Sequence, residues 1–229
     1  MAVGGAPVAE SSYFSANARC SALVGADGGG DTILAQGQIP DLVVGDMDSL
    51  TAQAREVIPP DRLHPIAEQD STDFEKVLRV TEAPLVLAVG FTGGRLDHGL
   101  AALHALIRFC DRAVILLGGE DLIFHTPRHI DLILPPDSRL SLFPLGPVRV
   151  RGTGVKWPKA GLDIVMDPMT KIGTSNEVTK GQVALATDRP GLLTILPATS
   201  LDAAIGALDA ADFHSPRPEP AAKGVTNLL

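Results

Sequence analysis

Short apolar runs that end in glycine or in polar residues recur through the first half of the chain. Runs such as residues 42–44 (L-V-V) and 85–89 (L-V-L-A-V) are nearly continuous, without alternating polar positions. Continuous runs indicate parallel strands covered on both faces, because neither face of such a strand meets water. The expected strands lie at residues 3–5, 22–24, 42–44, 85–89 and 114–117. Helix-like segments lie between some of them, so residues 1–130 are expected to form an open, mostly parallel, Rossmann-like α/β sheet.

Two helices in this half can be placed from their first residues. Thr72 and Glu75 form a capping-box pattern, in which Thr72 caps the first turn and Glu75 reaches back to it. A second helix is expected from about Leu96, with an apolar stripe that runs from Leu100 to Ile107. Each helix has an aspartate in its first turn, where the helix dipole favours a negative charge.

After about residue 130 the pattern changes to short runs separated by turn residues such as P-P-D at 135–137. Residues 140–142 and 148–150 alternate apolar and polar side chains, which is typical of antiparallel strands with one covered face. Residues 131–213 are therefore expected to form an all-β sandwich domain. Residues 214–229, rich in proline, alanine and charge, are expected to form a flexible tail.

The composition excludes several classes of protein. With 45% hydrophobic and 20% charged residues the chain of 229 residues is expected to fold, and its formal net charge of -8 argues against a nucleic-acid or anionic-membrane partner. Two cysteines, Cys20 and Cys110, are too few for a disulfide framework and lack the spacing of metal ligands. The N-terminus does not resemble a signal peptide, and no uncharged run approaches the ~18 residues of a membrane span. We expect a cytoplasmic protein.

Carboxylates repeatedly follow the expected strands or flank the start of an expected helix. The set comprises Asp27, Asp46, Asp48, Asp70, Asp73 and Asp97. Any one of them could be a helix cap or a solvated turn residue, but the carboxyl ends of parallel strands meet at one edge of a sheet, where ligands bind. Two carboxylates as close as Asp46 and Asp48 repel each other unless a cation lies between them or one is protonated. Oxygen ligands in this number suit Mg²⁺, which is held by a few carboxylates, water and substrate phosphates.

Glycine-rich turns accompany these carboxylates. The glycines at residues 28–30 and 93–94 follow expected strands, and such turns can bring backbone N–H groups close to phosphate oxygens. Neither turn matches the P-loop or the dinucleotide-binding fingerprint. Arg95 could hold phosphate oxygens or pair with a nearby carboxylate. His98 could be a catalyst or a structural neighbour. Together with the carboxylates, these turns predict a site for a metal-bound phosphate ligand.

Six segments, taken in order, resemble one enzyme family. Four lie in the first half: A-D-G-G at 26–29, P-D-L-V-V-G-D-M-D-S at 40–49, Q-D-S-T-D-F-E-K-V-L at 69–78 and G-G-R-L-D-H at 93–98. Two lie in the second half: G-V-K-W-P at 154–158 and T-S-N-E at 174–177. In order and spacing they resemble the thiamine pyrophosphokinase (thiamine diphosphokinase) family. The chain departs from the family at Gly30 and Asp31, where Ala-Asn is usual, and this affects the expected nucleotide contacts.

The resemblance implies a Mg²⁺-dependent enzyme that transfers the pyrophosphoryl group of ATP to the hydroxyl group of thiamine, giving thiamine diphosphate and AMP. It also implies a homodimer whose thiamine pocket uses both subunits. The implied metal ligands are Asp46, Asp48, Asp70 and Asp73, with Arg95 and Asp97 as further catalytic residues. The implied ATP contacts are Asp27, Gly28, Gly29, Gly93, Gly94 and Arg95. The implied thiamine contacts are Trp157, Thr174, Ser175 and Asn176.

Two other functions stay open on the sequence. One is a pyrophosphokinase for another hydroxymethyl substrate, such as a pterin alcohol, and the other is a non-catalytic thiamine- or nucleotide-binding protein. Trp157, if it is not simply a core or interface aromatic, favours thiamine, because an indole ring attracts a cationic thiazolium. The large set of carboxylates argues against mere binding.

Overall fold

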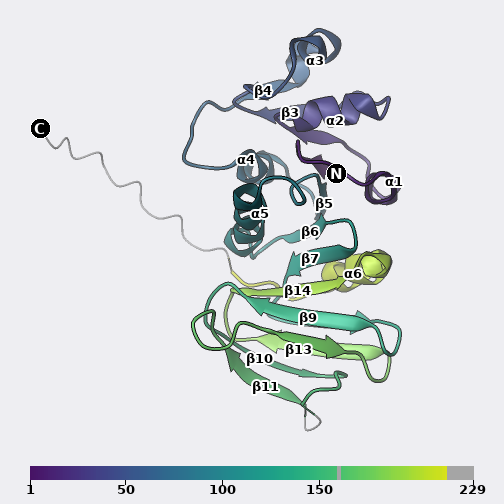
Figure 1. Cartoon of the computed structure of the whole chain (residues 1–229), viewed down its shortest axis with the longest axis vertical. Coiled ribbons are helices and arrows are strands. Elements are labelled where there is room, and N and C mark those ends of the chain that lie inside the picture. Colours follow the sequence, from purple (N-terminus) through teal and green to yellow (C-terminus); the bar gives the residue numbers. More distant parts are fainter. Residues whose placement is uncertain (159–160, 216–229) are drawn as a thin grey trace, which may run out of the picture.

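The first half of the chain forms parallel strands of one large sheet, as its continuous apolar runs predict (Figure 1). The computed structural model describes residues 1–158 and 161–215. The parallel strands are β1 (Ala2–Val3), β2 (Val24–Ala26), β3 (Leu42–Gly45), β4 (Leu63–Pro65), β5 (Leu85–Val89) and β6 (Ala113–Leu117). They lie in the order β4-β3-β2-β1-β5-β6. The carboxyl ends of β2, β3 and β5 therefore share one edge of the sheet.

The same sheet continues into the second half of the chain. Its antiparallel strands are β7 (Asp121–His125), β9 (Arg139–Pro144), β12 (Thr174–Glu177) and β14 (Leu192–Pro197). Within the described ranges the full sheet has ten strands, in the order β12-β9-β14-β7-β6-β5-β1-β2-β3-β4. β7 and β14 join the halves, with Ile123 opposite Ile195. The two halves expected from the sequence therefore share one mixed sheet.

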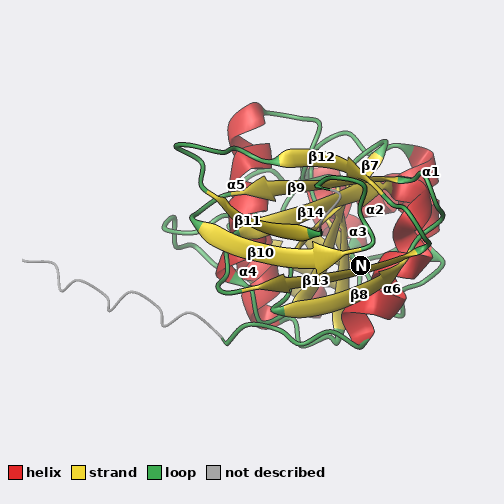
Figure 2. Cartoon of the chain, turned by 90° about the horizontal axis from the view of Figure 1, so that it is seen from below, coloured by secondary structure: helices red, strands yellow, loops and turns green. Residues whose placement is uncertain are grey.

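A second, four-stranded antiparallel sheet covers the end of the first. It consists of β8 (His129–Ile133), β10 (Val148–Thr153), β11 (Leu162–Met166) and β13 (Gln182–Thr187), in the order β11-β10-β13-β8. Leu132, Val150 and Val183 on its inner face share a core with Leu142 and Leu196 of the large sheet. Seen from this end of the molecule, β8, β13 and β10 lie in front of β14 of the large sheet (Figure 2). The layer that faces the small sheet is thus part of the ten-stranded sheet.

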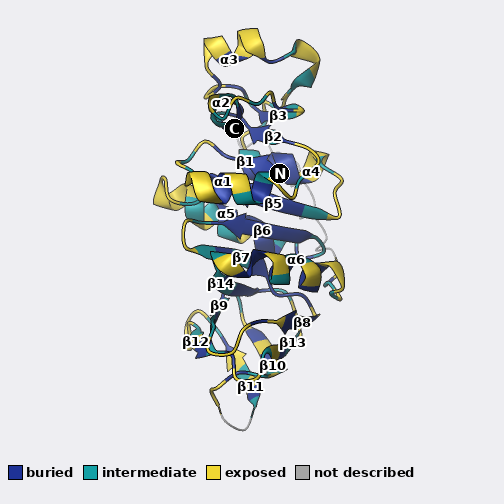
Figure 3. Ribbon diagram, turned by 90° about the vertical axis from the view of Figure 1, so that its right-hand side faces the viewer, coloured by how far each residue is buried: buried dark blue, intermediate teal, exposed yellow. Residues whose placement is uncertain are grey.

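Helices cover both faces of the parallel strands. They are α1 (Glu10–Asn17), α2 (Gly29–Ala35), α3 (Ala52–Val57), α4 (Asp73–Val80), α5 (Leu96–Arg108) and α6 (Leu201–Asp209), with short 3₁₀ turns η1 (Pro60–Arg62) and η2 (Ala198–Ser200). Leu87 and Val89 of β5 pack in the core with α1, α2 and α6, whereas Val86 and Ala88 pack with α4 and α5. Figure 3 shows these strands buried between helices with exposed outer faces. Burial on both faces explains the continuous apolar runs.

Helix α5 begins at Leu96, as expected, and Ile107 of the predicted stripe is buried. Leu100 is 56% exposed, and Ala102, Ala105 and Leu106 are buried with Ile107. These positions also have helical spacing, so the apolar pattern alone fits more than one orientation of the helix. Small alanine side chains let α5 lie close to the sheet, and the prediction of a buried Leu100 was wrong.

The end of the described chain is anchored to the small sheet. His214, the first residue of the expected tail, is buried, and its Nε2 lies 2.8 Å from the Thr187 hydroxyl. The rest of that expected tail, from residue 216, lies outside the described residues. Across the described part of the chain, none of the helices combines the length and the apolar character needed to cross a bilayer.

Candidate active site

Three carboxylates meet at the carboxyl edge of the parallel strands. Asp27 follows β2, and Asp46 and Asp48 follow its neighbour β3. One carboxylate oxygen from each residue lies within 4.8 Å of the others. These three residues are called the acidic centre below. Neighbouring parallel strands that each end in aspartate explain why residues far apart in the sequence come together.

Asp27 is the buried member of the acidic centre, only 3% exposed. Its φ of 44° lies in the left-handed region, which aspartate tolerates better than most residues. Its Oδ2 accepts a hydrogen bond from Ser49 N at 2.9 Å, while its buried Oδ1 has no hydrogen-bond partner among the described residues. Burial raises the pKa of Asp27, and the Ser49 N–H bond opposes this rise. A buried carboxylate oxygen without a donor is costly, so Asp27 is suited to binding a cation.

The loop before α4 holds Asp46 in place. Gln69 Nε2 donates to Asp46 Oδ2 at 2.6 Å, and the backbone N of Asp48 donates to Asp46 Oδ1 at 3.2 Å. These bonds, the Gln69 bond first, lower the pKa of Asp46. The Ser49 hydroxyl donates to Asp48 Oδ1 at 2.9 Å. Gln69 thus supports the acidic centre, a role that its place in a family-like segment did not reveal.

Asp73 stands beside Asp27 because α4 begins there. The Thr72 hydroxyl accepts from Glu75 N at 3.3 Å and Glu75 accepts from Thr72 N at 3.1 Å, so the predicted capping box is confirmed. A Cβ added at Gly45 would lie 3.2 Å from Asp73 Oδ1 and 2.8 Å from Asp27 Cβ. Only glycine at this position allows β3, Asp27 and α4 to approach so closely.

Asp70 is not one of the three residues of the acidic centre. It is exposed, and the hydrogen bond at this residue runs from its backbone N to Glu68 at 2.7 Å. The sequence groups Asp46 and Asp48 with Asp70 and Asp73, whereas the structure groups them with Asp27.

Arg95 and Asp97 form an exposed ion pair at the start of α5. Arg95 Nε and Nη2 donate to the two carboxylate oxygens of Asp97 at 3.1 and 2.6 Å, which lowers the pKa of Asp97. The turn that leads to them contains Gly93 and Gly94, and His98 is exposed on the first turn of the helix. β1 separates β5 from β2, so the strand that leads to this pair lies about 10 Å from β2 across the sheet.

The glycines after β2 have a packing role. A Cβ added at Gly29 would lie 1.8 Å from Val3 O, so any side chain there would push α2 away from β1. Gly28 is the N-cap residue of α2, with Ser49 as its neighbour. The close approach of α2 to the sheet explains Gly29 without a ligand, and phosphate contact by these glycines stays a prediction.

The predicted thiamine residues lie on β12 and on the loop after β10. Trp157 is 49% exposed, and Lys156 Nζ lies 4.8 Å from the centroid of its ring and 2.6 Å from Glu177. Buried Asn176 accepts from Trp157 N at 3.1 Å and donates from Nδ2 to Trp157 O at 2.6 Å. The Asn176 amide therefore holds the Trp157 backbone.

Thr174 and Ser175 belong to the same short strand. β12 pairs with β9 at the edge of the large sheet, so the T-S-N-E segment is a strand. Ser175 is exposed, and the Thr174 hydroxyl donates to Ser175 O at 3.3 Å. The strand therefore presents polar groups to solvent next to the Trp157 loop.

These residues are far from the acidic centre of the same chain. Seven inter-strand spacings separate β12 from β2, which is about 34 Å along the sheet. Figure 3 shows the two strands toward opposite ends of the long axis. A single chain therefore does not bring both parts of the predicted site together.

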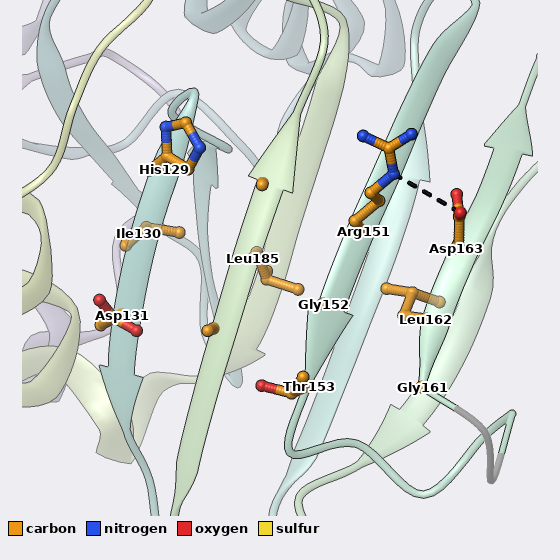
Figure 4. A pocket seen from close by; sticks show the side chains of 12 residues that line it. His129, Ile130, Asp131, Arg151, Gly152, Thr153, Gly161, Leu162, Asp163 and Leu185 are labelled. Atoms are coloured by element: carbon orange, nitrogen blue, oxygen red, sulfur yellow. Dashed lines mark ion pairs between the residues drawn. The ribbon is translucent and has the colours of Figure 1, made fainter.

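A groove on the small sheet belongs to neither part. It measures about 390 Å³ and lies where Arg151 and Asp163 form an ion pair at 3.5 Å (Figure 4). None of the predicted site residues lines it. The acidic centre is instead an open edge of the sheet, which suits a ligand that supplies part of the metal coordination.

An open α/β sheet with carboxylates at the carboxyl ends of its parallel strands defines a class of proteins that bind ligands at that edge. Within this class, the family model described as "Thiamin pyrophosphokinase, catalytic domain" matches residues 14–116. That stretch contains the acidic centre, Arg95 and Asp97. Over this stretch the chain is similar to the catalytic domain of the thiamine pyrophosphokinase family.

Curated relatives agree with this family. Thiamine pyrophosphokinase 1 of Arabidopsis thaliana is 29% identical over 181 residues, which cover 68% of this chain and 65% of that protein. Thiamin pyrophosphokinase 1 of Caenorhabditis elegans is 30% identical over 168 residues, which cover 64% and 65%. The chain thus matches slightly less than two thirds of the length of these relatives.

Solved structures share the fold. The thiamin pyrophosphokinase of Geobacillus thermodenitrificans superposes with a TM-score of 0.72 at 24% identity, covering 86% of this chain and 96% of its own. A thiamin pyrophosphokinase family protein of Enterococcus faecalis gives 0.65 at 25% identity, with 86% and 97% covered. A large mixed sheet with a separate antiparallel sheet is therefore the fold of this family.

Proposed function

We propose that the chain is a thiamine diphosphokinase, which transfers the pyrophosphoryl group of ATP to the hydroxyl group of thiamine and releases AMP. The observation that supports this most directly is the acidic centre with its buried, partnerless Asp27 Oδ1, in a chain that is similar to this family. Relatives named thiamine pyrophosphokinase in a plant and a nematode support the same reaction.

The donor set of the acidic centre fits Mg²⁺. Opposite ligand oxygens of an octahedral Mg²⁺ are about 4.2 Å apart. Carboxylate oxygens that already lie within 4.8 Å of one another need only small side-chain rotations to share one ion. We assign Asp27, Asp46 and Asp48 as ligands; Asp73 stands close by, and Asp70 is the least favoured of the expected ligands. Bound Mg²⁺ would neutralise the triphosphate, which a bare carboxylate cluster repels.

In the proposed reaction the thiamine oxygen forms a bond to the β-phosphorus of ATP. The bond from that phosphorus to the oxygen bridging to the α-phosphorus breaks, and AMP leaves. Such transfers depend on positioning and on neutralising charge. Arg95 and Asp97, which follow β5 on the same edge of the sheet, would meet another part of the extended triphosphate. Arg95 would exchange Asp97 for phosphate oxygens, leaving Asp97 to orient the thiamine hydroxyl or to join the metal ligands.

The proposed thiamine site is the half-exposed ring of Trp157. The ammonium of Lys156 already lies over this ring, which illustrates its affinity for a cation. A thiazolium would take the place of that ammonium, and Glu177 would stay close to Lys156. Thr174 and Ser175 would bond the polar edge of the pyrimidine, and Asn176 would keep Trp157 in place.

We infer that two copies of the chain form each complete site. About 34 Å between β2 and β12 is far longer than an extended thiamine molecule, so the acidic centre of one copy must meet Trp157 of another. A homodimer with thiamine at the interface would bring the acidic centre of one copy to Trp157 of the other. Residues 1–130 would then be a Rossmann-like catalytic unit, and residues 131–213 a sandwich that binds thiamine and dimerises. A cytoplasmic location is part of the proposal, supported by the low cysteine content.

An AMP-release assay tests the proposal. The chain is incubated with ATP, thiamine and Mg²⁺, and the expected products are AMP and thiamine diphosphate in equal amounts. Omitting thiamine or adding EDTA should abolish both. ADP with thiamine monophosphate would contradict pyrophosphoryl transfer. AMP release with a pterin alcohol instead of thiamine would indicate the other pyrophosphokinase, and thiamine binding without AMP would indicate a binding protein.

A further inference from the structure

Lys76 is a lysine almost completely removed from solvent. Its side chain is 2% exposed on the buried face of α4, between Glu75 and Val77, which are also buried. Lysine is almost never fully buried unless it is paired, because its ammonium loses its hydration. The surroundings of Lys76 must therefore supply negative charge.

That charge comes from the region of the acidic centre. Lys76 Nζ lies 3.1 Å from Asp73 Oδ1, one helical turn earlier. Asp73 Oδ1 and Asp27 Cβ both lie close to the point where a Cβ on Gly45 would be, so Asp73 and Asp27 are neighbours. α4 packs against β2 and β3, the strands that deliver the acidic centre. The ammonium thus lies inside the protein, behind a cluster of carboxylates that open toward solvent.

The carboxylates of the acidic centre lie within 4.8 Å of one another, and Asp73 lies beside Asp27. Like charges so close together repel. The ammonium of Lys76, 3.1 Å from Asp73 Oδ1, offsets part of this repulsion.

We propose that Lys76 is a positioning residue, an internal counter-ion that holds Asp73 and keeps the carboxylates of the acidic centre close together before a metal ion binds. Its burial keeps it from touching a substrate, so it acts through Asp73. The proposal rests on the proposed function in one respect, that the acidic centre is a metal site. If Lys76 were only a packing residue, it would stabilise the fold through its aliphatic stem. The effect of replacing it would then not depend on Mg²⁺.

The test compares thermal unfolding of Lys76→Met with and without Mg²⁺. Methionine keeps the volume of the stem and removes the charge. The midpoint of the metal-free variant should fall by about 5 °C, because the carboxylates then repel without compensation. Saturating Mg²⁺ should restore most of this loss, so the Mg²⁺-induced shift should be larger than in the unmodified chain. An equal loss with and without Mg²⁺ would overturn the proposal.

Two further variants make the result specific. Asp73→Asn combined with Lys76→Met removes both charges and should regain much of the metal-free stability; no regain would also overturn the proposal. This pair still decides the matter if Lys76→Met alone fails to fold. Lys180→Met, at an exposed lysine, changes the net charge by the same amount. It should alter neither the metal-free midpoint of unfolding nor the shift that Mg²⁺ causes. If Mg²⁺ does not stabilise even the unmodified chain, the metal part of the proposed function fails. The metal-free comparison of Lys76→Met with the double variant still tests whether Lys76 is a counter-ion.

Discussion

At the scale of single residues, Asp27 and Asp70 distinguish two versions of the metal site. Asp27→Asn should raise the Mg²⁺ concentration for half-maximal AMP formation by about 10-fold or more, because it removes a charged ligand and keeps the acceptor for Ser49 N–H. Asp70→Asn should change it less than about 2-fold, because Asp70 is exposed and outside the acidic centre. A Mg²⁺ titration of AMP release measures both. A large effect of Asp70→Asn with none of Asp27→Asn would favour the ligand set expected from the sequence.

Asn176 allows a second prediction at this scale. If it positions Trp157, Asn176→Ala should raise KM for thiamine about 10-fold, since the loop loses two hydrogen bonds. It should also shift the fluorescence of Trp157, the only tryptophan, in the absence of any ligand. Ser175→Ala, at an exposed neighbour, should leave that fluorescence unchanged. Unchanged ligand-free fluorescence in Asn176→Ala would mean that Asn176 contacts thiamine directly.

The residue-level site could be predicted only in part. The spacing of Asp46 and Asp48 after an apolar run placed both correctly at the end of a strand, because that relation is local. The contact of Asp27 with them depends on the pairing of β2 with β3 and on an aspartate at positive φ, and the spacing of residues reveals neither. Burial of Lys76 depends in the same way on how α4 docks.

At the scale of elements, the start of α4 joins stability to the site. Thr72→Ala should cost about 1 kcal/mol of unfolding free energy, or about 2–4 °C in Tm, because the capping box loses its acceptor for Glu75 N. It should also raise the Mg²⁺ requirement, because Asp73 lies in the loosened turn. Thr72→Ser keeps the hydroxyl and should match the unmodified chain in both measurements. A loss of stability without a change in Mg²⁺ requirement would separate the helix start from the site.

The elements that the sequence predicted are those with local signals. The capping box placed α4, and continuous apolar runs placed β5 and, within one residue, β6. β12 carries T-S-N-E, with no apolar residue, and is a strand only because its backbone pairs with β9 at a sheet edge. α5 was placed correctly, but Leu100 was wrongly expected on its buried face, because Ala102 and Ala105 carry too little apolar surface to be recognised there.

At the scale of the whole molecule, the large sheet changes from parallel to antiparallel pairing at β7, shortly before the change expected at residue 130. The sequence correctly predicted parallel strands followed by antiparallel strands, because each kind of strand has its own short pattern of apolar residues. It could not predict that β14 returns to pair with β7, some 70 residues earlier in the chain. That pairing makes the large sheet continuous and sets the separation of about 34 Å between β2 and β12.

This separation leads to a complementation experiment. Asp46→Asn disables the acidic centre and Trp157→Ala disables the thiamine part, so each variant alone should be nearly inactive although folded. If each site combines the acidic centre of one copy with Trp157 of another, a mixed dimer has one site with both defects and one with neither. Co-expression at equal levels makes about half of the dimers mixed, so about one quarter of the unmodified activity should return.

The matched control combines two variants of the same half of the site. Asp46→Asn co-expressed with Asp27→Asn leaves every acidic centre damaged, so no activity should return, whatever the proportion of mixed dimers. AMP release from each purified mixture measures the recovery, and size-exclusion chromatography verifies that dimers are present. Recovery in the first mixture alone requires that the two ends of the long sheet meet across copies. Equal and negligible recovery in both mixtures would place a complete site within one chain, and the sheet would then have to bend far more than its strand order implies.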